Sequence, residues 1–211
     1  MNKEEFIEEC NKININITEE QLNQLDQFYQ LMLEWNEKIN LTRITEEQEV
    51  YLKHFYDSLT LNKVVNLKEI NTLCDVGTGA GFPGIVLKMV FPNLKITLID
   101  SLQKRVNYLN EIIKKLNLKD IEAIHSRGED YKGSFDVVTS RAVANIEKLV
   151  DYTMHLVSKE GIFIAMKGNI EEEFTEPVKN KIERKYKIIK IEEFLLPKEN
   201  SKRSLVVIQN K

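Results

Sequence analysis

The segment that most constrains this chain runs from residue 71 to residue 100, where two apolar stretches flank a glycine-dense turn. An apolar run at 73–76 leads into the turn, which holds Gly77, Gly79, Gly81 and Gly84. A helical pattern follows from 82 to 90, and a second β-rich run at 96–99 ends at Asp100. This order predicts a strand, a tight loop, a helix and a second strand, which is the start of an α/β fold.

The glycines and the terminal acid of this segment predict a site for an adenosine-containing cofactor. Glycine lets the main chain turn tightly or approach a ligand without a β-carbon, and the amides that open the next helix offer hydrogen-bond donors. Pro83 suits a first helical position, where a missing N–H costs nothing. Asp100 is placed to accept hydrogen bonds from a ribose diol. The segment therefore predicts half of a cofactor site.

The glycine spacing is compatible with two cofactors. Gly79, Gly81 and Gly84 form the Gly-x-Gly-x-x-Gly pattern of dinucleotide sites, which is a weak match by itself. Asp75 lies two residues before the first glycine, where a carboxylate would repel a pyrophosphate but attract a cationic amino-acid group. The arrangement D-x-G-x-G-x-G resembles motif I of the class I S-adenosylmethionine-dependent methyltransferases, whose cofactor carries an ammonium and a sulfonium. We therefore favour S-adenosylmethionine as the cofactor. A nicotinamide dinucleotide is less favoured, and a turn that binds no ligand is the least favoured of the three.

Composition excludes several classes of protein. A length of 211 residues with 42% hydrophobic residues suffices for one α/β domain with a modest extension. No apolar run approaches the ~20 residues of a membrane span, and the acidic start MNKEEFIEEC is unlike a signal peptide. Cys10 and Cys74 fall in a predicted helix and a buried strand, which favours a reduced, cytoplasmic setting. The histidines and cysteines lack ligand spacing, so we expect no metal.

The net charge of −3 is unevenly distributed along the chain. Residues 1–70 hold the acidic excess, whereas 71–150 and 151–211 are each slightly basic. A chain that binds nucleic acid unselectively would be basic throughout, so this one would bind RNA through a local patch. Ordinary solvated surfaces explain the charge pattern equally well.

Residues 1–70 are predicted to form a helical cap on the α/β domain at 71–211, packed with it as one unit. A short helix at 3–10 precedes a longer one opened by a capping box at 18–21, and a second capping-box pattern at 45–48 introduces another helix to residue 64. His54 and Asp57 lie three residues apart on one helical face. A structural role is favoured for this pair, and we do not expect His54 to act as a general base.

After Asp100 the predicted elements alternate between helix and strand. A helix with Ser101 as its N-cap comes first. The next elements are strands at 121–125 and 135–140, a helix from about 146 to 157, a strand at 161–167 and a helix over 170–184. Two last β runs, 187–196 and 203–209, are too close for a crossover helix and therefore pair antiparallel. The whole is predicted to be a Rossmann-like methyltransferase sheet, mostly parallel with a closing antiparallel hairpin.

Three segments should lie at the carboxyl ends of the strands, where open α/β sheets bind ligands. The loop with Gly128 and Glu129 would contact the adenine ring in a methyltransferase layout. Arg141 follows the fourth strand, at the position where the methyl acceptor binds. Lys167 ends the fifth strand, and phosphate contact and simple solvation are both open for it.

Six ordered motifs together resemble the glucose-inhibited division protein B family. They are WNEKINLT at 35–42, HFYDSL at 54–59, DVGTGAGFPG at 75–84, DSLQKRV at 100–106, SR at 126–127 with Glu129, and TSRA at 139–142. The match covers nearly the whole chain, and the GFPG and SRA variants are narrower than the general class I pattern. Family members are S-adenosylmethionine-dependent enzymes that methylate N7 of one guanine in small-subunit (16S) ribosomal RNA.

The resemblance implies site residues and partners. It places cofactor contacts on Gly77, Phe82, the Gly128–Glu129 pair and Arg141, beside Asp75, Gly79 and Asp100 of the motifs. Residue 128 is often alanine or valine in relatives, and a main-chain contact would survive the change to glycine. The implied partner is small-subunit ribosomal RNA or the ribosomal subunit, with no DNA and no membrane, for a monomeric cytoplasmic enzyme.

The chemistry of guanine N7 needs little from the protein besides positioning. N7 carries a lone pair already, so no general base is expected and catalysis comes mostly from holding the reactants in line. Arg141 could hydrogen-bond guanine O6 or a phosphate. N7 is hard to reach in an A-form major groove, so the target should lie in unpaired RNA. A nicotinamide oxidoreductase, a non-catalytic RNA-binding module and a small-molecule methyltransferase stay open as alternatives.

Overall fold

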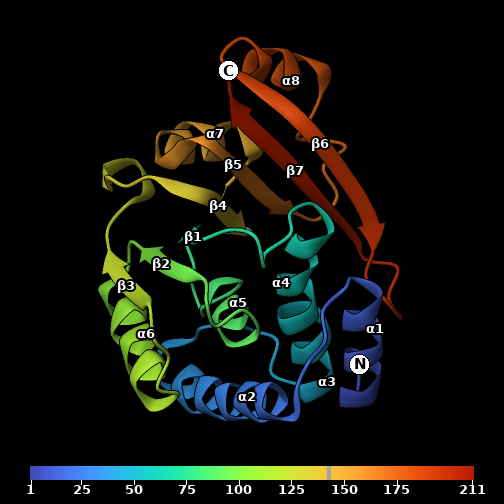
Figure 1. Cartoon of the computed structure of the whole chain (residues 1–211), viewed down its shortest axis with the longest axis vertical. Coiled ribbons are helices and arrows are strands. Elements are labelled where there is room, and N and C mark those ends of the chain that lie inside the picture. Colours follow the sequence, from blue (N-terminus) through green and yellow to red (C-terminus); the bar gives the residue numbers. More distant parts are fainter. Residues whose placement is uncertain (142–143) are drawn as a thin grey trace.

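A mixed β-sheet forms the centre of the molecule (Figure 1). The computed structural model describes residues 1–141 and 144–211. The seven strands of the sheet lie in the order β3-β2-β1-β4-β5-β7-β6. The strands are β1 (Thr72–Val76), β2 (Lys95–Asp100), β3 (Ile121–His125), β4 (Phe135–Arg141), β5 (Val157–Lys167), β6 (Tyr186–Leu195) and β7 (Lys202–Asn210). The first five are parallel, and β7 pairs antiparallel with both β5 and β6. The predicted sheet with its closing hairpin is confirmed.

Apolar side chains cover both faces of the sheet, as expected for parallel strands. Because successive residues of a strand point to opposite faces, Leu73 and Val137 join one hydrophobic cluster and their neighbours Cys74 and Val138 join the other. The first cluster continues into residues 1–70, so the cap and the sheet share one core.

The helices after β1 flank the sheet, and several differ from the predicted bounds. They are α5 (Gly84–Val90), α6 (Gln103–Lys115), the 3₁₀ turns η3 (Gly128–Asp130) and η4 (Met154–Leu156), α7 (Ile146–Thr153) and α8 (Glu176–Glu183). The helix expected from 82 begins at 84, the one expected to reach 157 ends at 153, and the one expected over 170–184 is confined to 176–183. Residue 157 instead opens β5, whose pairing with β4 starts there.

Two of the predicted helix caps are wrong and one is confirmed. The Thr18 hydroxyl accepts from Gln21 N at 3.2 Å, and the Gln21 side chain accepts from Thr18 N at 3.0 Å, which completes the predicted box. At α6 the N-cap is Leu102 rather than Ser101, and Asp100 Oδ1 accepts from Leu102 N at 2.9 Å. The helix expected from Thr45 begins after Glu46 without a side-chain cap.

The cap consists of two long helices and one segmented helix. These are α1 (Lys3–Lys12), α2 (Glu19–Ile39), and a continuous stretch of α3 (Glu47–Val50), the π-helix η1 (Tyr51–Tyr56), α4 (Asp57–Leu59) and the 3₁₀ helix η2 (Thr60–Lys63). Gln21 Nε2 donates to Val90 O at 2.9 Å, which ties the start of α2 to the end of α5. The π-helix carries His54, and such turns often occur at functional sites.

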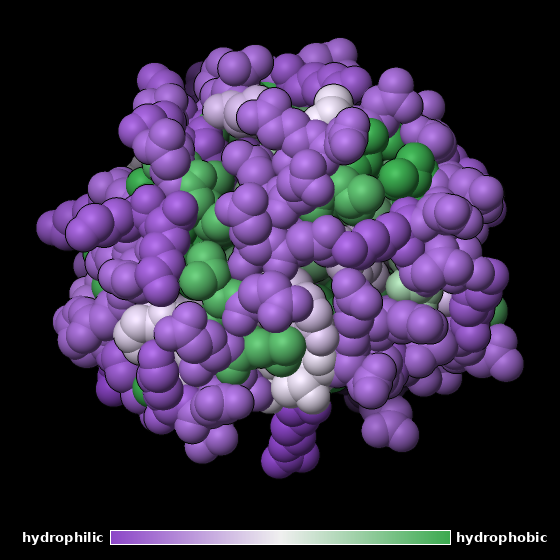
Figure 2. Space-filling model, turned by 90° about the horizontal axis from the view of Figure 1, so that it is seen from below, coloured by the Kyte–Doolittle hydropathy of each residue, from purple (hydrophilic) through white to green (hydrophobic). Residues whose placement is uncertain are grey.

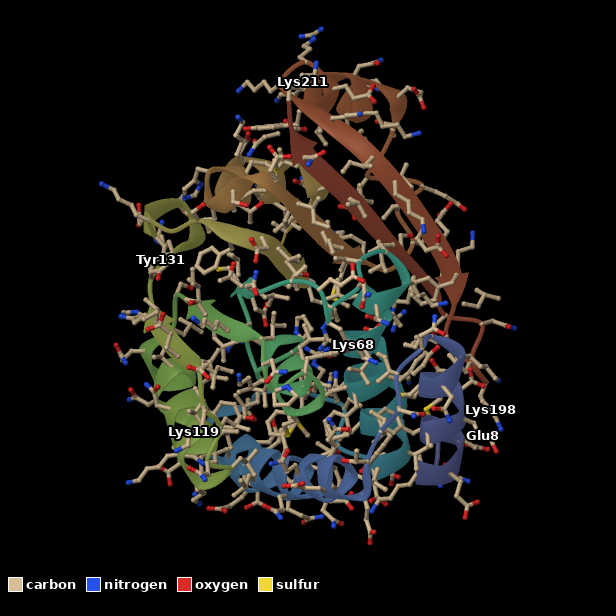
Figure 3. All side chains as sticks on the ribbon, viewed as in Figure 1. Glu8, Lys68, Lys119, Tyr131, Lys198 and Lys211 are labelled. Atoms are coloured by element: carbon tan, nitrogen blue, oxygen red, sulfur yellow. The ribbon has the colours of Figure 1, made fainter. Side chains whose placement is uncertain are left out.

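The outer surface of the cap is polar. Seen from the α2 side, the molecule is mostly hydrophilic, with hydrophobic side chains in small separate areas (Figure 2). The turn between β6 and β7 reaches α1: Lys198 lies beside this helix, at the edge where Glu8 is labelled (Figure 3), and pairs with Glu5. Of the helices in the described parts of the chain, none has both the length and the apolar character that a bilayer crossing requires.

Candidate active site

A cleft of about 830 Å³ opens at the carboxyl ends of β1, β2, β4 and β5. One wall is the glycine loop after β1 with the end of β2, where Gly77, Gly79 and Asp100 lie. The other comes from the cap, the ends of β4 and β5, and the start of β7, and includes Thr42, His54, Asp57, Arg141, Lys167 and Arg203. We call these the glycine wall and the assembled wall. This position is the one expected for a ligand in an open α/β sheet.

The glycine wall is held by hydrogen bonds to β2. Gly77 N donates to Ile99 O at 2.8 Å, and Gly79 N donates to Asp100 Oδ2 at 2.9 Å. Both glycines have positive φ, 73° and 60°, a conformation that residues with a β-carbon rarely adopt. A β-carbon on Gly79 would enter open space, its nearest neighbour being Gly77 O at 4.0 Å. The main chain is therefore open to a ligand here.

Asp75 lies beneath the glycine wall rather than on the cleft surface. Its side chain is fully buried, and its Oδ2 accepts from Gly84 N at 2.9 Å. Its Oδ1 and the nearby Thr78 hydroxyl have no hydrogen-bond partner among the described residues. Burial raises the pKa of Asp75 to about 6. Contact between Asp75 and a cofactor cation stays a prediction, and the structure assigns this carboxylate to the packing of the loop.

The Gly128–Glu129 pair lies outside the cleft lining, in η3. Gly128 is buried against β1, where a β-carbon would come within 2.7 Å of Val76 Cγ1. An alanine or valine at this position would thus require Val76 to move. The Glu129 carboxylate lies 3.9 Å from the Arg127 guanidinium. Its predicted contact with adenine stays a prediction.

Arg141 is the centre of the assembled wall. Its Nη1 donates to Lys53 O at 3.0 Å and to Asp57 Oδ2 at 3.1 Å, and its Nη2 lies 3.2 Å from His54 Nδ1. The guanidinium also lies over the Phe82 ring, 5.2 Å from its centroid. The end of β4, the π-helix of the cap and the glycine loop therefore meet at one side chain. Ala142, the last residue of the predicted motif, lies outside the described residues.

His54 is built into this wall as a neutral ring. It stacks on Phe82 with 4.3 Å between centroids, and its Nε2 lies 3.0 Å from Thr42 Oγ1. Burial, together with the positive charge of Arg141, lowers the pKa of His54 to about 3. Both ring nitrogens are engaged by neighbouring groups, so the ring is poorly suited to accept a proton from a substrate, in line with the structural role predicted for it.

Asp57 links two cations from distant parts of the chain. It is 4% exposed, and its Oδ1 accepts from Arg203 Nε at 3.0 Å while its Oδ2 pairs with Arg141. Arg203 is not among the site residues predicted from the sequence. The available signal was topological: because β7 runs antiparallel to β5, with Ser204 opposite Lys167, the first residues of β7 lie at the carboxyl ends of the parallel strands.

The Lys167 side chain is 12% exposed and its ammonium is paired within the protein. Its ammonium donates to Ala144 O at 2.6 Å and lies 2.9 Å from Glu173 Oε1. It nevertheless lines the cleft, as do Glu173 and the adjacent Asn169. If Lys167 contacted a phosphate, its ammonium would have to bind the phosphate and the Glu173 carboxylate at the same time.

The residues of the glycine wall fit S-adenosylmethionine. Asp100 keeps acceptor capacity for a ribose diol mainly at Oδ1, which receives only Leu102 N, because Oδ2 receives Gly79 N and lies 3.5 Å from Arg105 Nη1 and each carboxylate oxygen can accept about two hydrogen bonds. Thr78 also lines the cleft, and its buried hydroxyl oxygen has no hydrogen-bond partner among the described residues. Within the described chain no cluster of metal-ligating side chains is found.

Comparison with solved structures places the fold among methyltransferases. A methyltransferase titled as SAM dependent, from Aquifex aeolicus, superposes with a TM-score of 0.58 at 21% identity, covering 77% of this chain and 93% of that one. The StiE O-MT fragment of residues 961–1257 gives a TM-score of 0.63 at 14% identity, covering 84% and 81%. At these identities the likeness shows the fold, and it agrees with the predicted class I methyltransferase sheet.

Sequence comparison is more specific. A ribosomal RNA small subunit methyltransferase G from Lactobacillus helveticus is 46% identical over 99% of this chain and 91% of its own length, and one from Bacillus pumilus is 41% identical over 100% and 91%. The GidB family model, described as rRNA small subunit methyltransferase G, matches residues 21–206. The predicted family and the predicted class of enzyme are confirmed: this chain belongs to the GidB family of methyltransferases.

Proposed function

We propose that this cleft transfers the methyl group of S-adenosylmethionine to N7 of a guanine in small-subunit ribosomal RNA. The observation that carries the proposal is the position of Arg141, held at the end of β4 across from the glycine wall by the cap residues Asp57 and His54. The enzyme class comes from the family, and the target atom from the fit between this site and the chemistry of N7.

S-adenosylmethionine supplies an electrophilic methyl group on a sulfonium when bound. Gly77, Gly79 and Asp100 would hold its adenosine and amino-acid parts through main-chain and carboxylate contacts. Phe82 supplies an apolar ring at the junction of the two walls, stacked on His54. The roles of Gly128, Glu129 and Asp75 as cofactor contacts belong to this proposal as well.

No proton has to be removed before guanine N7 attacks a methyl group, because its lone pair is already available. The assembled wall agrees with this requirement: His54 is engaged through both ring nitrogens, and Arg141 can donate hydrogen bonds but cannot accept a proton. The protein's contribution is to hold the base in line and to exclude water.

RNA would reach the cleft along cations from four segments. Lys53, Arg105, Lys167 and Arg203 line it in addition to Arg141. Several of them pair with acids, as Lys53 does with Glu49 and Glu199, so RNA phosphates would replace carboxylates rather than meet unpaired charge. A local patch of this kind agrees with the overall net charge of −3. Because N7 faces the narrow major groove of A-form RNA, we expect an unpaired target base.

The proposal is tested by transfer of a radiolabelled methyl group to small-subunit RNA from cells that lack this enzyme. Naked RNA, assembled subunits and an unrelated RNA are compared, and the labelled nucleoside is identified by digestion and chromatography. We expect about one methyl per RNA, on guanine N7. Label on another atom would reject the proposal. Absence of label, although calorimetry shows that the cofactor binds, would also reject it and would favour a different methyl acceptor, such as a small molecule. Sedimentation of the same preparation tests the expected monomer, and localisation of a tagged chain tests the expected cytoplasmic site.

A further inference from the structure

Thr42 is held rigidly on the assembled wall by the loop between α2 and α3. Asn40 ends α2 in the left-handed conformation with φ 50°, and Thr42 N donates to Asn36 Oδ1 at 2.8 Å. The half-buried Thr42 side chain lines the cleft between two apolar neighbours, Leu41 and Ile44. Thr42 is therefore part of the cleft lining, on a backbone held by a hydrogen bond to α2.

The protonation pattern of His54 follows from its neighbour on the other side. Arg141 Nη2 has only hydrogens to offer, so at 3.2 Å from His54 Nδ1 it must donate and Nδ1 must accept. A neutral imidazole has one donor and one acceptor, so Nε2 carries the hydrogen and donates to Thr42 Oγ1 at 3.0 Å. Lys53 O also lies 3.2 Å from Nδ1, but it already accepts from Arg141 Nη1 and does not require the ring proton.

Two N–H groups thus converge on the Thr42 oxygen. Ile44 N donates to Oγ1 at 3.1 Å, in addition to His54 Nε2. A hydroxyl has two lone pairs and one hydrogen, so both acceptor positions of Thr42 are filled. Its own hydrogen finds no acceptor within residues 1–141 and 144–211 of the structure. The hydroxyl can therefore only donate, and an acceptor for it would have to come from a ligand in the cleft that Thr42 lines.

We propose that the Thr42 hydroxyl donates a hydrogen bond to O6 of the target guanine and so selects guanine over adenine. The inference rests on the proposed function and names the side chain that reads the base. O6 lies next to N7 on the same edge of guanine, where adenine presents an amino donor instead. An ordinary hydroxyl would rotate to accept from that amine. Because both of its lone pairs are occupied, the Thr42 hydroxyl cannot accept a hydrogen bond from that amine. With adenine in the site, two hydrogen-bond donors would therefore face each other without an acceptor.

The chain His54–Thr42 also gives His54 a positioning role. Because Arg141 donates to Nδ1, this nitrogen must act as the acceptor of the neutral ring. Nε2 therefore carries the hydrogen and donates to Thr42. Phe82 stacks on the ring and keeps it in the plane that makes both contacts possible.

The test compares two acceptors that differ at O6. Synthetic RNA is prepared with either guanine or 2-aminopurine at the mapped target position; 2-aminopurine keeps N7 but lacks O6. We expect Thr42→Val to lower kcat/KM on the guanine RNA about ten- to a hundredfold and to leave the much slower 2-aminopurine reaction nearly unchanged. Thr42→Ser, which keeps the hydroxyl, should retain most of the activity. Thr45→Val, an exposed threonine of the same cap, is the matched control and should have no effect.

The outcomes separate this inference from the function on which it rests. Equal losses on both RNAs, with a thermal shift, would make Thr42 a structural residue of the loop and overturn the inference alone. Unchanged transfer by Thr42→Val would also overturn it. Absence of any N7 methylation by the unaltered enzyme would reject the proposed function. Nitrogen NMR of His54 gives an independent answer: hydrogen on Nδ1 rather than Nε2 would leave the Thr42 hydroxyl donating to the ring, and the inference would fail.

Discussion

The glycine wall comes from one continuous segment and the end of the neighbouring strand, whereas the assembled wall brings together side chains from residues 42 to 203. The first wall presents main-chain groups, fixed by short hydrogen bonds to β2. The second presents side chains whose positions depend on one another through Arg141, Asp57 and His54. The glycine wall should therefore tolerate changes elsewhere in the molecule, and the assembled wall should fail as a unit.

The largest effect on stability is expected from the buried charge of the assembled wall. Asp57→Asn leaves Arg141 and Arg203 facing each other without their shared carboxylate and should lower the free energy of unfolding by about 3–5 kcal/mol, as measured by urea denaturation. The control is Glu192→Gln on β6, a half-buried side chain whose pair with the exposed Lys190 should contribute about 0.5 kcal/mol or less. Similar values for both variants would show that the buried network is not what holds this wall.

A large effect on transfer is expected at Arg141 itself. Arg141→Ala should reduce methyl transfer roughly a hundred- to a thousandfold, because it removes the side chain that holds His54 and Asp57 in place beside the cleft, and should change folding less. Activity and thermal melting are measured on the same preparations. Arg141→Lys keeps the charge but loses the fork that reaches Lys53 O, Asp57 and His54 together, and should restore stability more than activity. Parallel loss of folding and transfer in Arg141→Ala would reduce this residue to a structural one.

A buried carboxyl group, Asp75, also lies beneath the glycine wall. Its pKa makes the stability of the protein depend on pH in a defined direction. Asp75 has a folded pKa of about 6 against an ordinary value of 3.8, so the unfolded chain releases this proton first. Stability from this group is therefore lost as the pH rises from about 4 to 6, by roughly 3 kcal/mol. Asp75→Asn should remove that slope in urea denaturation at several pH values. An unchanged slope would assign the effect to other groups.

The smallest effect on stability is expected at Gly79, where the effect on cofactor binding should be much larger than the effect on folding. Gly79→Ala places a β-carbon at positive φ, which should cost about 1 kcal/mol in unfolding experiments. Because that β-carbon enters the open cleft, cofactor binding by calorimetry should weaken far more than stability. Binding equal to that of the unaltered enzyme would mean that the cofactor does not approach the main chain at Gly79.

Local signals predicted local structure well. The strands, the antiparallel hairpin and the Thr18 capping box depend on short-range patterns, and each is present, although β5 begins at 157 rather than at the predicted 161. The predicted N-cap at Ser101 was wrong: the helix is preceded by Leu102, which provides no side-chain cap, and the Asp100 carboxylate accepts from the Leu102 amide. The helix over 170–184 was predicted too long, since Pro177 suits only the first turn of a helix and α8 accordingly begins at Glu176.

The sequence by itself determined the family, the sheet and the glycine wall, because consecutive residues specify a strand, a loop and a helix through hydrogen bonds over short distances. Only the tertiary structure decided that Asp75 lies beneath the loop, that Arg203 joins Arg141 at Asp57, and that the Thr42 hydroxyl is left as a donor. Each of these depends on groups that strand register and cap packing bring together from positions far apart in the chain. Burial and hydrogen-bond saturation are properties of that arrangement, and they do not appear in the order of the residues.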